Sequence, residues 1–254
     1  MIGLILGTSE GKKILSLLNN FTEDIFVSCT TDYGADLLKG YRFSVINKKP
    51  LNYLELVNSL KENKISLLID SSHPYAVEIT KNAMMACEEL GIQYLRFERK
   101  SLQSKYNNYK NIVNVEDYSQ LADKLTGIKG TILNTTGSRA LNKILGMKLN
   151  NRIVHRVLPT EKVIRECISY NIAVDDIIAM KGPFSLELNI AFIKQFKAEA
   201  MILKDSGEAG GTEEKIIACF ETGINAFMIS REKLEYKKIF EEEEKLVTYI
   251  RDVF

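Results

Sequence analysis

The sequence predicts an α/β protein with two Rossmann-like, doubly wound parallel-sheet domains that face a shared cleft. Short apolar runs alternate with longer amphipathic stretches along almost all of the 254 residues, as in parallel sheets covered by helices. A polar, aromatic segment interrupts this alternation around residues 100–111, which is typical of a linker. A glycine-rich turn follows an apolar run in each half, at Gly7–Gly11 and at Ser206–Gly211.

Residues 1–100 are predicted to form the N-terminal domain. Strands buried on both faces are continuous apolar runs, as residues 65–70 nearly are. Pro74 suits the first turn of the helix that follows. The predicted strands cover residues 2–6, 25–30, 43–46, 65–70 and 93–97. The predicted helices cover residues 10–19, 33–39, 52–63 and 76–90.

Residues 110–254 are predicted to form a second domain of the same kind, because the alternation resumes after the linker. The predicted strands lie near residues 112–115, 130–134, 152–157, 176–180, 200–204 and 226–229. The predicted helices cover residues 117–125, 139–146, 160–170, 185–197, 213–222 and 240–252. We interpret the four glutamates at 241–244 as the solvated start of the last helix.

Composition predicts a cytoplasmic protein without a nucleic-acid or membrane partner. The apolar fraction of 45% is enough to fill a core. The net charge of +1 does not indicate a polyanionic partner. No apolar run approaches the length of a membrane span. The four cysteines are scattered without CxxC spacing, which favours reduced, buried thiols.

The turn Gly7-Thr8-Ser9-Glu10-Gly11 is predicted to bind the pyrophosphate of a dinucleotide. A strand, a turn without Cβ atoms and a helix N-terminus together direct several N–H groups at one point. The turn departs from G-x-G-x-x-G, because Ser9 takes the place of the second glycine and Glu10 precedes the last. The alternative is a tight turn in which Thr8 or Ser9 caps the helix. Its position after the first strand favours the cofactor.

Further polar clusters follow other predicted strands of the first domain, at the edge where open parallel sheets bind ligands. Ser72, His73 and Tyr75 follow the fourth strand; the alternative there is that Asp70 caps the next helix and His73 is structural. The second strand is followed by Thr31 and Asp32. An acid at this point can bind a ribose 2′-hydroxyl and favours NADH, whereas Thr30 and Thr31 could also bind the 2′-phosphate of NADPH.

The second domain has two such clusters and a further loop. Arg139 lies at the start of a predicted helix, where a cation opposes the helix dipole, so we expect an anionic ligand. The alternative is that Thr136 and Ser138 only cap that helix. Three glycines within residues 207–211 are hard to explain as a mere connection, and Lys181 lies in another loop on the same edge. His155 lies within a strand pattern and is interpreted as packed, and no residue spacing supports a metal site.

In this order, these motifs resemble the precorrin-6A reductase family of cobalamin biosynthesis. The resemblance spans nearly the whole chain, with small departures: Leu6 stands where many members carry a further glycine, and Lys12 where arginine is common. The matching stretches are ILGTSEGKKIL, DSSHPYAVEITKNAMMACEELGIQYLRFER, NTTGSRAL, RVLPT, MKGPFS with ELN close behind, and KDSGEAGGTEEK.

The resemblance implies a reductase that uses NADPH or NADH to saturate one carbon–carbon double bond of a corrin precursor, without a metal of its own. The expected cofactor residues are Gly7, Thr8, Ser9, Glu10, Gly11, Thr31, Asp32, Ser72 and His73. The candidate catalytic proton donors are His73, Tyr75 and Lys204, with water as the alternative. The C-terminal domain is expected to bind the substrate through Gly137, Ser138, Arg139, Lys181, Lys204, Ser206, Gly207, Gly210, Gly211 and Thr212.

Two other functions are alternatives to a reductase. A tetrapyrrole methyltransferase also binds a nucleotide at a glycine turn, and a non-catalytic nucleotide-sensing domain would bind nicotinamide without turnover. A second glycine loop at residues 206–211 argues against a sensor, since sensing requires one pocket. We expect a monomer or a homodimer with a small-molecule substrate.

Overall fold

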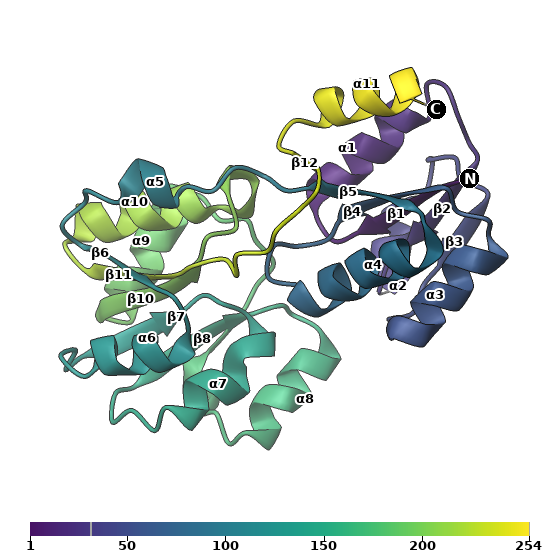
Figure 1. The fold of residues 1–254 in the computed structure, drawn as a ribbon. Coiled ribbons are helices and arrows are strands. Elements are labelled where there is room, and N and C mark those ends of the chain that lie inside the picture. The colour runs from purple at the N-terminus through teal and green to yellow at the C-terminus, as the bar shows by residue number, and fades with distance from the viewer. Residues whose placement is uncertain (31, 254) are drawn as a thin grey trace. The chain divides into compact units, whose positions relative to one another are not determined.

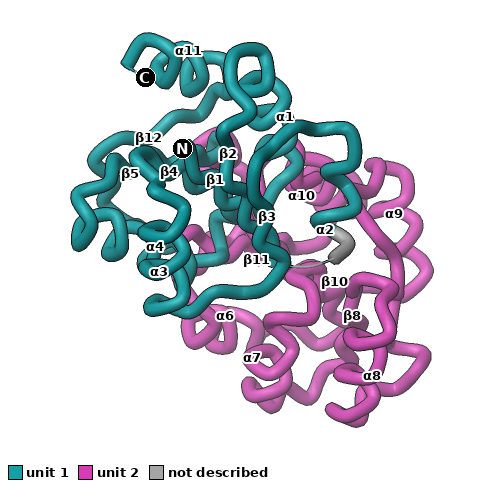
Figure 2. Tube along the Cα trace, turned by 90° about the vertical axis from the view of Figure 1, so that its right-hand side faces the viewer, with its two compact units in different colours: residues 1–100, 232–254 teal, residues 101–231 magenta. Residues whose placement is uncertain are grey.

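Two compact units make up the protein. The computed structural model describes residues 1–30 and 32–253, and it describes residues 32 and 33 through their backbone alone. Unit 1 comprises residues 1–100 and 232–254, and unit 2 comprises residues 101–231 (Figure 2). Each unit holds one six-stranded sheet. The predicted α/β class with two Rossmann-like sheets is therefore confirmed, whereas the shared cleft stays a prediction.

Unit 1 has the strand order of a dinucleotide-binding sheet. Its sheet runs β3-β2-β1-β4-β5-β12, with every neighbouring pair parallel. The strand order reverses between β1 and β4, and ligands of open α/β sheets bind at such a point. The elements are β1 (Ile2–Leu6), α1 (Ser9–Leu18), β2 (Ile25–Ser28), α2 (Asp32–Asp36), β3 (Val45–Asn47), α3 (Tyr53–Glu62), β4 (Leu67–Ser71), α4 (Val77–Leu90), β5 (Gln93–Phe97), β12 (Ile239–Phe240) and α11 (Glu243–Val253).

Helices cover both faces of the unit 1 sheet, with α1 and α11 on one side and α3 and α4 on the other (Figure 1). Local signals set the ends of two of these helices. Asn52 and Glu55 form a reciprocal capping box at the start of α3, which satisfies two backbone donors. Gly91 ends α4 with φ 65°, a left-handed conformation that glycine adopts without a Cβ clash.

The C-terminal segment differs from the predicted boundary, because residues 232–254 belong to unit 1 rather than to the second domain. Strand β12 pairs with β5, placing Phe240 opposite Phe97. Helix α11 packs on α1, and its Leu246 and Ile250 are fully buried in the same apolar cluster as Leu15. Burial of this apolar stripe stabilises the return of the chain.

Unit 2 has a sheet of the same kind in the order β6-β11-β10-β7-β8-β9, again all parallel. Its strand order reverses between β7 and β10. The elements are α5 (Gln103–Tyr106), β6 (Ile112–Val115), α6 (Tyr118–Leu125), β7 (Thr131–Asn134), α7 (Leu141–Gly146), β8 (Ile153–Val157), α8 (Glu161–Ser169), β9 (Ile177–Ala179), α9 (Leu186–Gln195), β10 (Ala198–Lys204), α10 (Thr212–Thr222) and β11 (Asn225–Ile229).

The segment predicted as a linker is part of unit 2. Residues 101–111 contain α5, and Leu102 and Tyr106 are buried in the core of that unit together with Met201 and Ile216. The polar composition of the segment concealed these two apolar anchors, which are four residues apart and therefore on one face of a helical turn.

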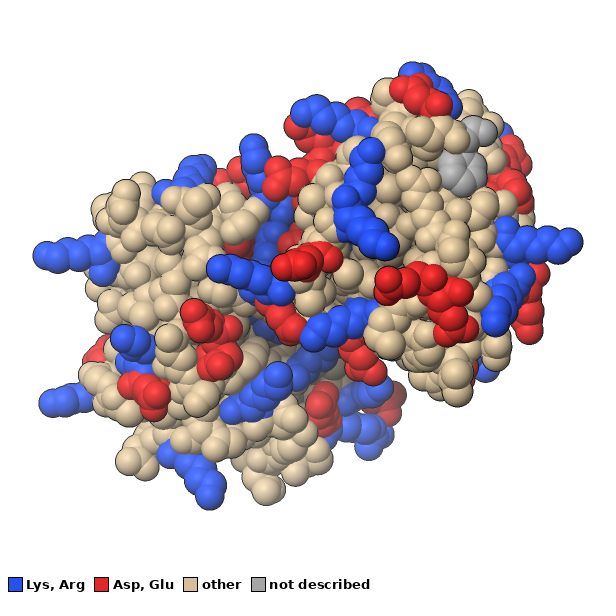
Figure 3. Space-filling model, in the orientation of Figure 1, with Lys and Arg blue, Asp and Glu red and all other residues tan. Residues whose placement is uncertain are grey.

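The distribution of charged side chains, the cysteines and the helices can be compared with what the composition predicted. On the face shown in Figure 3, acidic and basic side chains are interspersed over both units. All four cysteines are buried. Within residues 1–30 and 32–253, no helix has the length and apolarity that a bilayer crossing requires.

Candidate functional site

The turn after β1 and the turn after β4 touch each other at the point where the unit 1 strand order reverses. A Cβ atom on Gly7 would lie 2.7 Å from the backbone nitrogen of His73 and 2.8 Å from the Cα of Ser72. A Cβ atom on Gly11 would lie 2.7 Å from Oγ of Ser71. Gly7 is therefore required by the close approach of backbone atoms, whereas a Cβ on Gly11 would have to displace the side chains of Leu6 and Ser71. The pattern of the motif alone did not reveal these contacts.

The N-terminus of α1 has no side-chain cap. Thr8 occupies the N-cap position in an extended conformation without a capping hydrogen bond, and its hydroxyl donates instead to the carbonyl of Ser71 at 3.4 Å. The hydroxyl of Ser9 donates to the carboxylate of Glu10 at 3.0 Å. The alternative of a turn that only caps its helix is therefore not what the structure shows. The first N–H groups of α1 have the polarity that favours an anion.

The side chain of Glu10 is held by an arginine of the same unit. Arg99 lies 2.7 Å from the Glu10 carboxylate, and both side chains are 11% exposed. Because the carboxylate is paired in this way, the group that Glu10 can offer to an anion is its backbone N–H.

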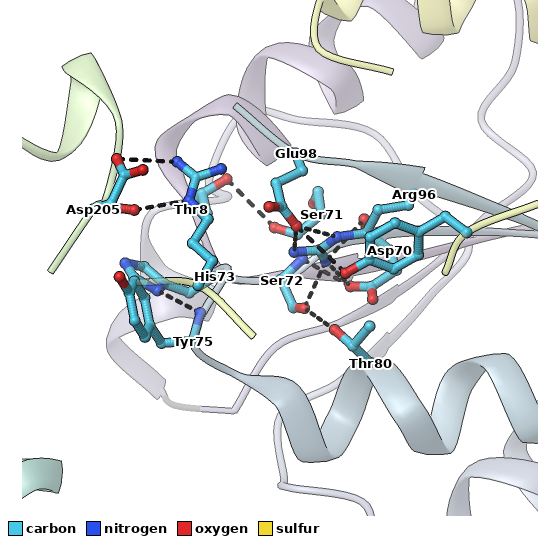
Figure 4. A network of polar contacts seen from close by, with 12 residues as sticks. Thr8, Asp70, Ser71, Ser72, His73, Tyr75, Thr80, Arg96, Glu98 and Asp205 are labelled. Atoms are coloured by element: carbon cyan, nitrogen blue, oxygen red, sulfur yellow. Dashed lines mark hydrogen bonds and ion pairs between the residues drawn. The ribbon is translucent and has the colours of Figure 1, made fainter. Parts of the chain in front are cut away.

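A buried polar network fixes the turn after β4 (Figure 4). Asp70 on β4 and Arg96 on β5 form an ion pair of 3.0 Å, and both are almost fully buried. Arg96 also donates to the hydroxyl of Ser72 at 3.0 Å, and that hydroxyl lies 3.1 Å from Oγ1 of Thr80. The Asp70 carboxylate accepts a hydrogen bond from the Ser72 N–H at 2.9 Å. Asp70 thus orders its own turn and does not cap α4, whose N-cap is Ala76.

Two more side chains belong to this network. The hydroxyl of Tyr94 donates to Asp70 at 2.8 Å, and burial, followed by the Asp70 charge, raises the pKa of Tyr94. Glu98 accepts from Arg96 at 2.9 Å. A fully hydrogen-bonded buried ion pair of this kind costs desolvation energy but specifies one geometry. Ser72 is consequently held in place through both its N–H and its hydroxyl.

His73 and Tyr75 lie apart from that network on the same turn (Figure 4). The Tyr75 N–H donates to Nδ1 of His73 at 3.3 Å, so a neutral His73 carries its proton on Nε2. The two ring centroids are 5.8 Å apart. Of the two remaining predicted cofactor residues, Thr31 falls outside the described residues, and Asp32 is described only as the first residue of α2.

In unit 2, the loop after β10 is ordered by its own side chains. The buried Asp205 carboxylate accepts from the N–H groups of Gly207 at 3.3 Å and Leu102 at 3.2 Å. The hydroxyl of Thr212 accepts from the N–H of Ser206 at 2.9 Å and donates to the carbonyl of Lys204 at 3.2 Å. Thr212, predicted as a substrate contact, is fully buried and acts within the loop.

Glycine conformation shapes this loop and its neighbour after β7. Gly207 and Gly211 have φ values of 70° and 66°, and Gly137 has φ 82°. Such values strain any residue with a Cβ atom. Each glycine therefore has a conformational role, whether or not it touches a ligand.

Cations meet at the carboxyl ends of β7 and β10. Burial, followed by the charges of Arg139 and Lys143, lowers the pKa of Lys204 to about 8. The structure thus brings Arg139 and Lys204 within electrostatic range of each other. Lys181, the third predicted cation, lies in the loop after β9 and is exposed.

A cavity of about 200 Å³ opens at the carboxyl ends of the unit 2 strands. Two predicted residues, Gly137 and Gly210, line it together with Arg156 and Lys215, which the sequence analysis missed. The sequence pattern could have indicated Lys215 as a buried cation, because it stands beside Ile216 on the buried side of an amphipathic helix. The cavity is lined by Thr135, Gly137, Arg156, Val157, Leu158, Met180, Gly182, Pro183, Phe184, Ala209, Gly210 and Lys215.

The neighbouring His155 has a structural environment. Its side chain is 1% exposed and lies 3.0 Å from the amide nitrogen of Asn134. Burial lowers its pKa to about 4, which agrees with a packed histidine. Among the described residues, no three His, Cys, Asp or Glu side chains are grouped so that they could hold a metal ion.

Comparisons with known proteins give a consistent result. The sequence model of the family described as "Precorrin-6x reductase CbiJ/CobK" matches residues 1–251. The cobalt-precorrin-6A reductase of Methanocaldococcus jannaschii is 33% identical over 243 residues, which cover 96% of this chain and 93% of that protein. The cobalt-precorrin-6A reductase of Priestia megaterium is 32% identical, with coverage of 97% and 96%. A solved structure of CobK precorrin-6A reductase superposes with a TM-score of 0.76 at 18% identity, covering 99% of this chain and 96% of that one, which supports the fold.

Proposed function

The chain belongs to the precorrin-6x reductase CbiJ/CobK family, and from this premise we propose that it reduces one carbon–carbon double bond of cobalt-precorrin-6A or precorrin-6A in cobalamin biosynthesis. A reduced nicotinamide supplies the hydride when it is bound. The observation that carries the proposal, beyond the family, is the contact between the turns after β1 and β4 at the point of strand-order reversal. Nucleotides bind at this point in such sheets.

The cofactor half of the proposal rests on unit 1. The uncapped N–H groups of α1 and the turn from Gly7 to Gly11 bind the pyrophosphate. Ser72 and His73 border the same place from the facing turn. Asp32 or Thr31 is proposed to contact the ribose and to decide between NADH and NADPH.

The substrate half rests on unit 2. A corrin precursor carries several carboxylates, and Arg139, Lys181 and Lys204 are cations at the carboxyl ends of the unit 2 strands. The loop from Ser206 to Thr212 follows β10 at the same ends. Hydride transfer requires the two ligands to meet, so the shared cleft belongs to the proposal. The reduced carbon also needs a proton.

Three side chains are the proposed donors of that proton. His73 has a proton on Nε2 in its neutral form, and Tyr75 lies beside it. Lys204, with a pKa of about 8, is largely charged at pH 7 and can donate as well. Each is placed at the end of a strand or in the loop that follows it, where open sheets bind their ligands.

The test is anaerobic incubation of the purified protein with cobalt-precorrin-6A and NADPH or NADH, without a methyl donor. We expect the absorbance of the reduced nicotinamide to fall and the macrocycle to gain two hydrogen atoms by mass spectrometry. Dependence on a methyl donor would identify a methyltransferase. Binding of nicotinamide without turnover would identify a sensor, and either result would contradict the proposal.

A further inference from the structure

Two cations in unit 2 are buried in the wall of the same cavity. The side chain of Arg156, at the end of β8, is 5% exposed, and Lys215, in the first turns of α10, is 8% exposed. Both line the cavity of about 200 Å³ described above. Charged side chains are rarely buried to this degree without an opposite charge.

The partners of these two cations within the chain are neutral. Nη1 of Arg156 donates to the amide oxygen of Asn189 at 2.8 Å, and the guanidinium lies 4.0 Å from the ring centroid of Phe184. Nζ of Lys215 donates to the carbonyl of Gly210 at 3.3 Å. Among the described residues, no carboxylate forms an ion pair with either cation within 4.0 Å.

The electrostatics of the cavity reflect this missing counter-charge. Burial, followed by the charge of Arg156, lowers the pKa of Lys215 to about 7, and the nearby Glu214 offsets only part of that effect. Burial likewise lowers the pKa of Arg156 to about 10. Two like charges in one desolvated site are costly, and an anion bound between them relieves that cost.

We propose that this cavity, the Arg156–Lys215 pocket, binds one carboxylate side chain of the macrocycle. The proposal rests on the proposed function and extends it to residues outside the predicted substrate site. The planar guanidinium suits a carboxylate through paired hydrogen bonds. The apolar wall of Val157, Leu158 and Phe184 suits the methylene groups that carry it.

Size decides which part of the ligand enters. Pockets for drug-sized molecules measure roughly 300–1,000 Å³, so a cavity of about 200 Å³ accepts a side chain but not a tetrapyrrole ring. A phosphate of the cofactor shares the anionic chemistry and is the alternative that the experiment must separate.

The test compares Arg156→Met and Lys215→Met with wild type and with Arg165→Met, in which an exposed cation on α8 is lost. Binding of cobalt-precorrin-6A is followed by its absorbance change without nicotinamide, and binding of NADPH and NADH by their fluorescence. We expect the dissociation constant for the tetrapyrrole to rise about 10- to 100-fold in the two pocket variants, since each loses a charge-assisted hydrogen bond. The nicotinamide constants and the Arg165→Met variant should stay at wild-type values.

A second measurement uses wild-type protein and so does not depend on how the variants fold. Lys215 is labelled with acetic anhydride and quantified by mass spectrometry, with and without the tetrapyrrole or NADPH. The tetrapyrrole should slow acetylation of Lys215 at least fivefold, and NADPH should not.

Unchanged tetrapyrrole affinity in both pocket variants, or equal acetylation with and without it, would overturn the proposal. Protection by NADPH with weaker NADPH binding in the variants would assign the pocket to a cofactor phosphate and overturn it as well. Failure of the reductase proposal is recognised separately, because it would appear as absent turnover in wild type while these binding measurements still report on the pocket.

Discussion

Replacing Gly7 with alanine should separate the two turns of the proposed cofactor site. The added Cβ would meet three backbone atoms, the His73 nitrogen at 2.7 Å, the Ser72 Cα at 2.8 Å and the Ser72 carbonyl carbon at 3.1 Å. Backbone atoms cannot rotate away, so the turns must move apart by up to about 1 Å. Overpacking of this kind costs about 1–3 kcal/mol, and a shift of about 1 Å in a site costs on the order of 100-fold in rate.

The assay for Gly7→Ala combines urea unfolding, a fluorescence titration with reduced nicotinamide and initial rates of its oxidation. Gly127→Ala is the matched control, because a Cβ on Gly127 meets no atom within 4 Å. We expect at least tenfold weaker nicotinamide binding in Gly7→Ala and wild-type binding in the control. Wild-type nicotinamide affinity in a folded Gly7→Ala protein would refute the placement of the cofactor at this turn.

Three further changes test the site and its electrostatics. Asp70→Asn removes one of the two carboxylates that pair with the buried Arg96 and leaves only Glu98. It should lower the free energy of unfolding in urea by about 1–3 kcal/mol. Glu161→Gln, in an exposed pair, should cost under about 1 kcal/mol, and equal losses would contradict this. The pKa of Lys215 falls from 10.5 to about 7 on folding. Between about pH 7 and pH 10.5 the unfolded chain therefore binds a proton that the folded protein does not, so the free energy of unfolding should rise with pH in this range. Equal slopes of the free energy of unfolding against pH in wild type and Lys215→Met would contradict this prediction. His73→Ala should lower kcat by about 100-fold or more, and an unchanged kcat across pH would leave Tyr75, Lys204 or water as the donor.

Local patterns predicted most of the fold because the signals lay within single elements. Residues 2–6 were predicted as a strand with the ends that the structure has, since buried parallel strands are continuous apolar runs. Residues 93–97 were predicted with the right ends as well, although Gln93 and Arg96 interrupt the apolar pattern there. The glycine turn was recognised from its place behind the first strand. Its packing against the turn after β4 depends on residues more than sixty positions away, so no local pattern could show it.

The features that were missed depend on distant parts of the chain. Strand β12 has two residues, too few for any periodicity, and only pairing with β5 defines it. The Arg156–Lys215 pocket joins the ends of β7, β8 and β10 with the loop after β9, and a strand that contains an arginine gives no local sign of which side chains will surround it. The ribose contact, proposed for Thr31 and Asp32, stays a prediction.

The return of residues 232–254 to unit 1 sets an order for folding during synthesis. Domains normally fold from the N-terminus onward as the ribosome releases them. Here the continuous unit 2 is complete once residue 231 has emerged, while the apolar face of α1 still lacks its cover from α11. Unit 1, which is translated first, is therefore the last to be completed. A nascent chain halted after residue 231 would carry a folded unit 2 together with an incomplete unit 1, whose uncovered apolar surface favours aggregation.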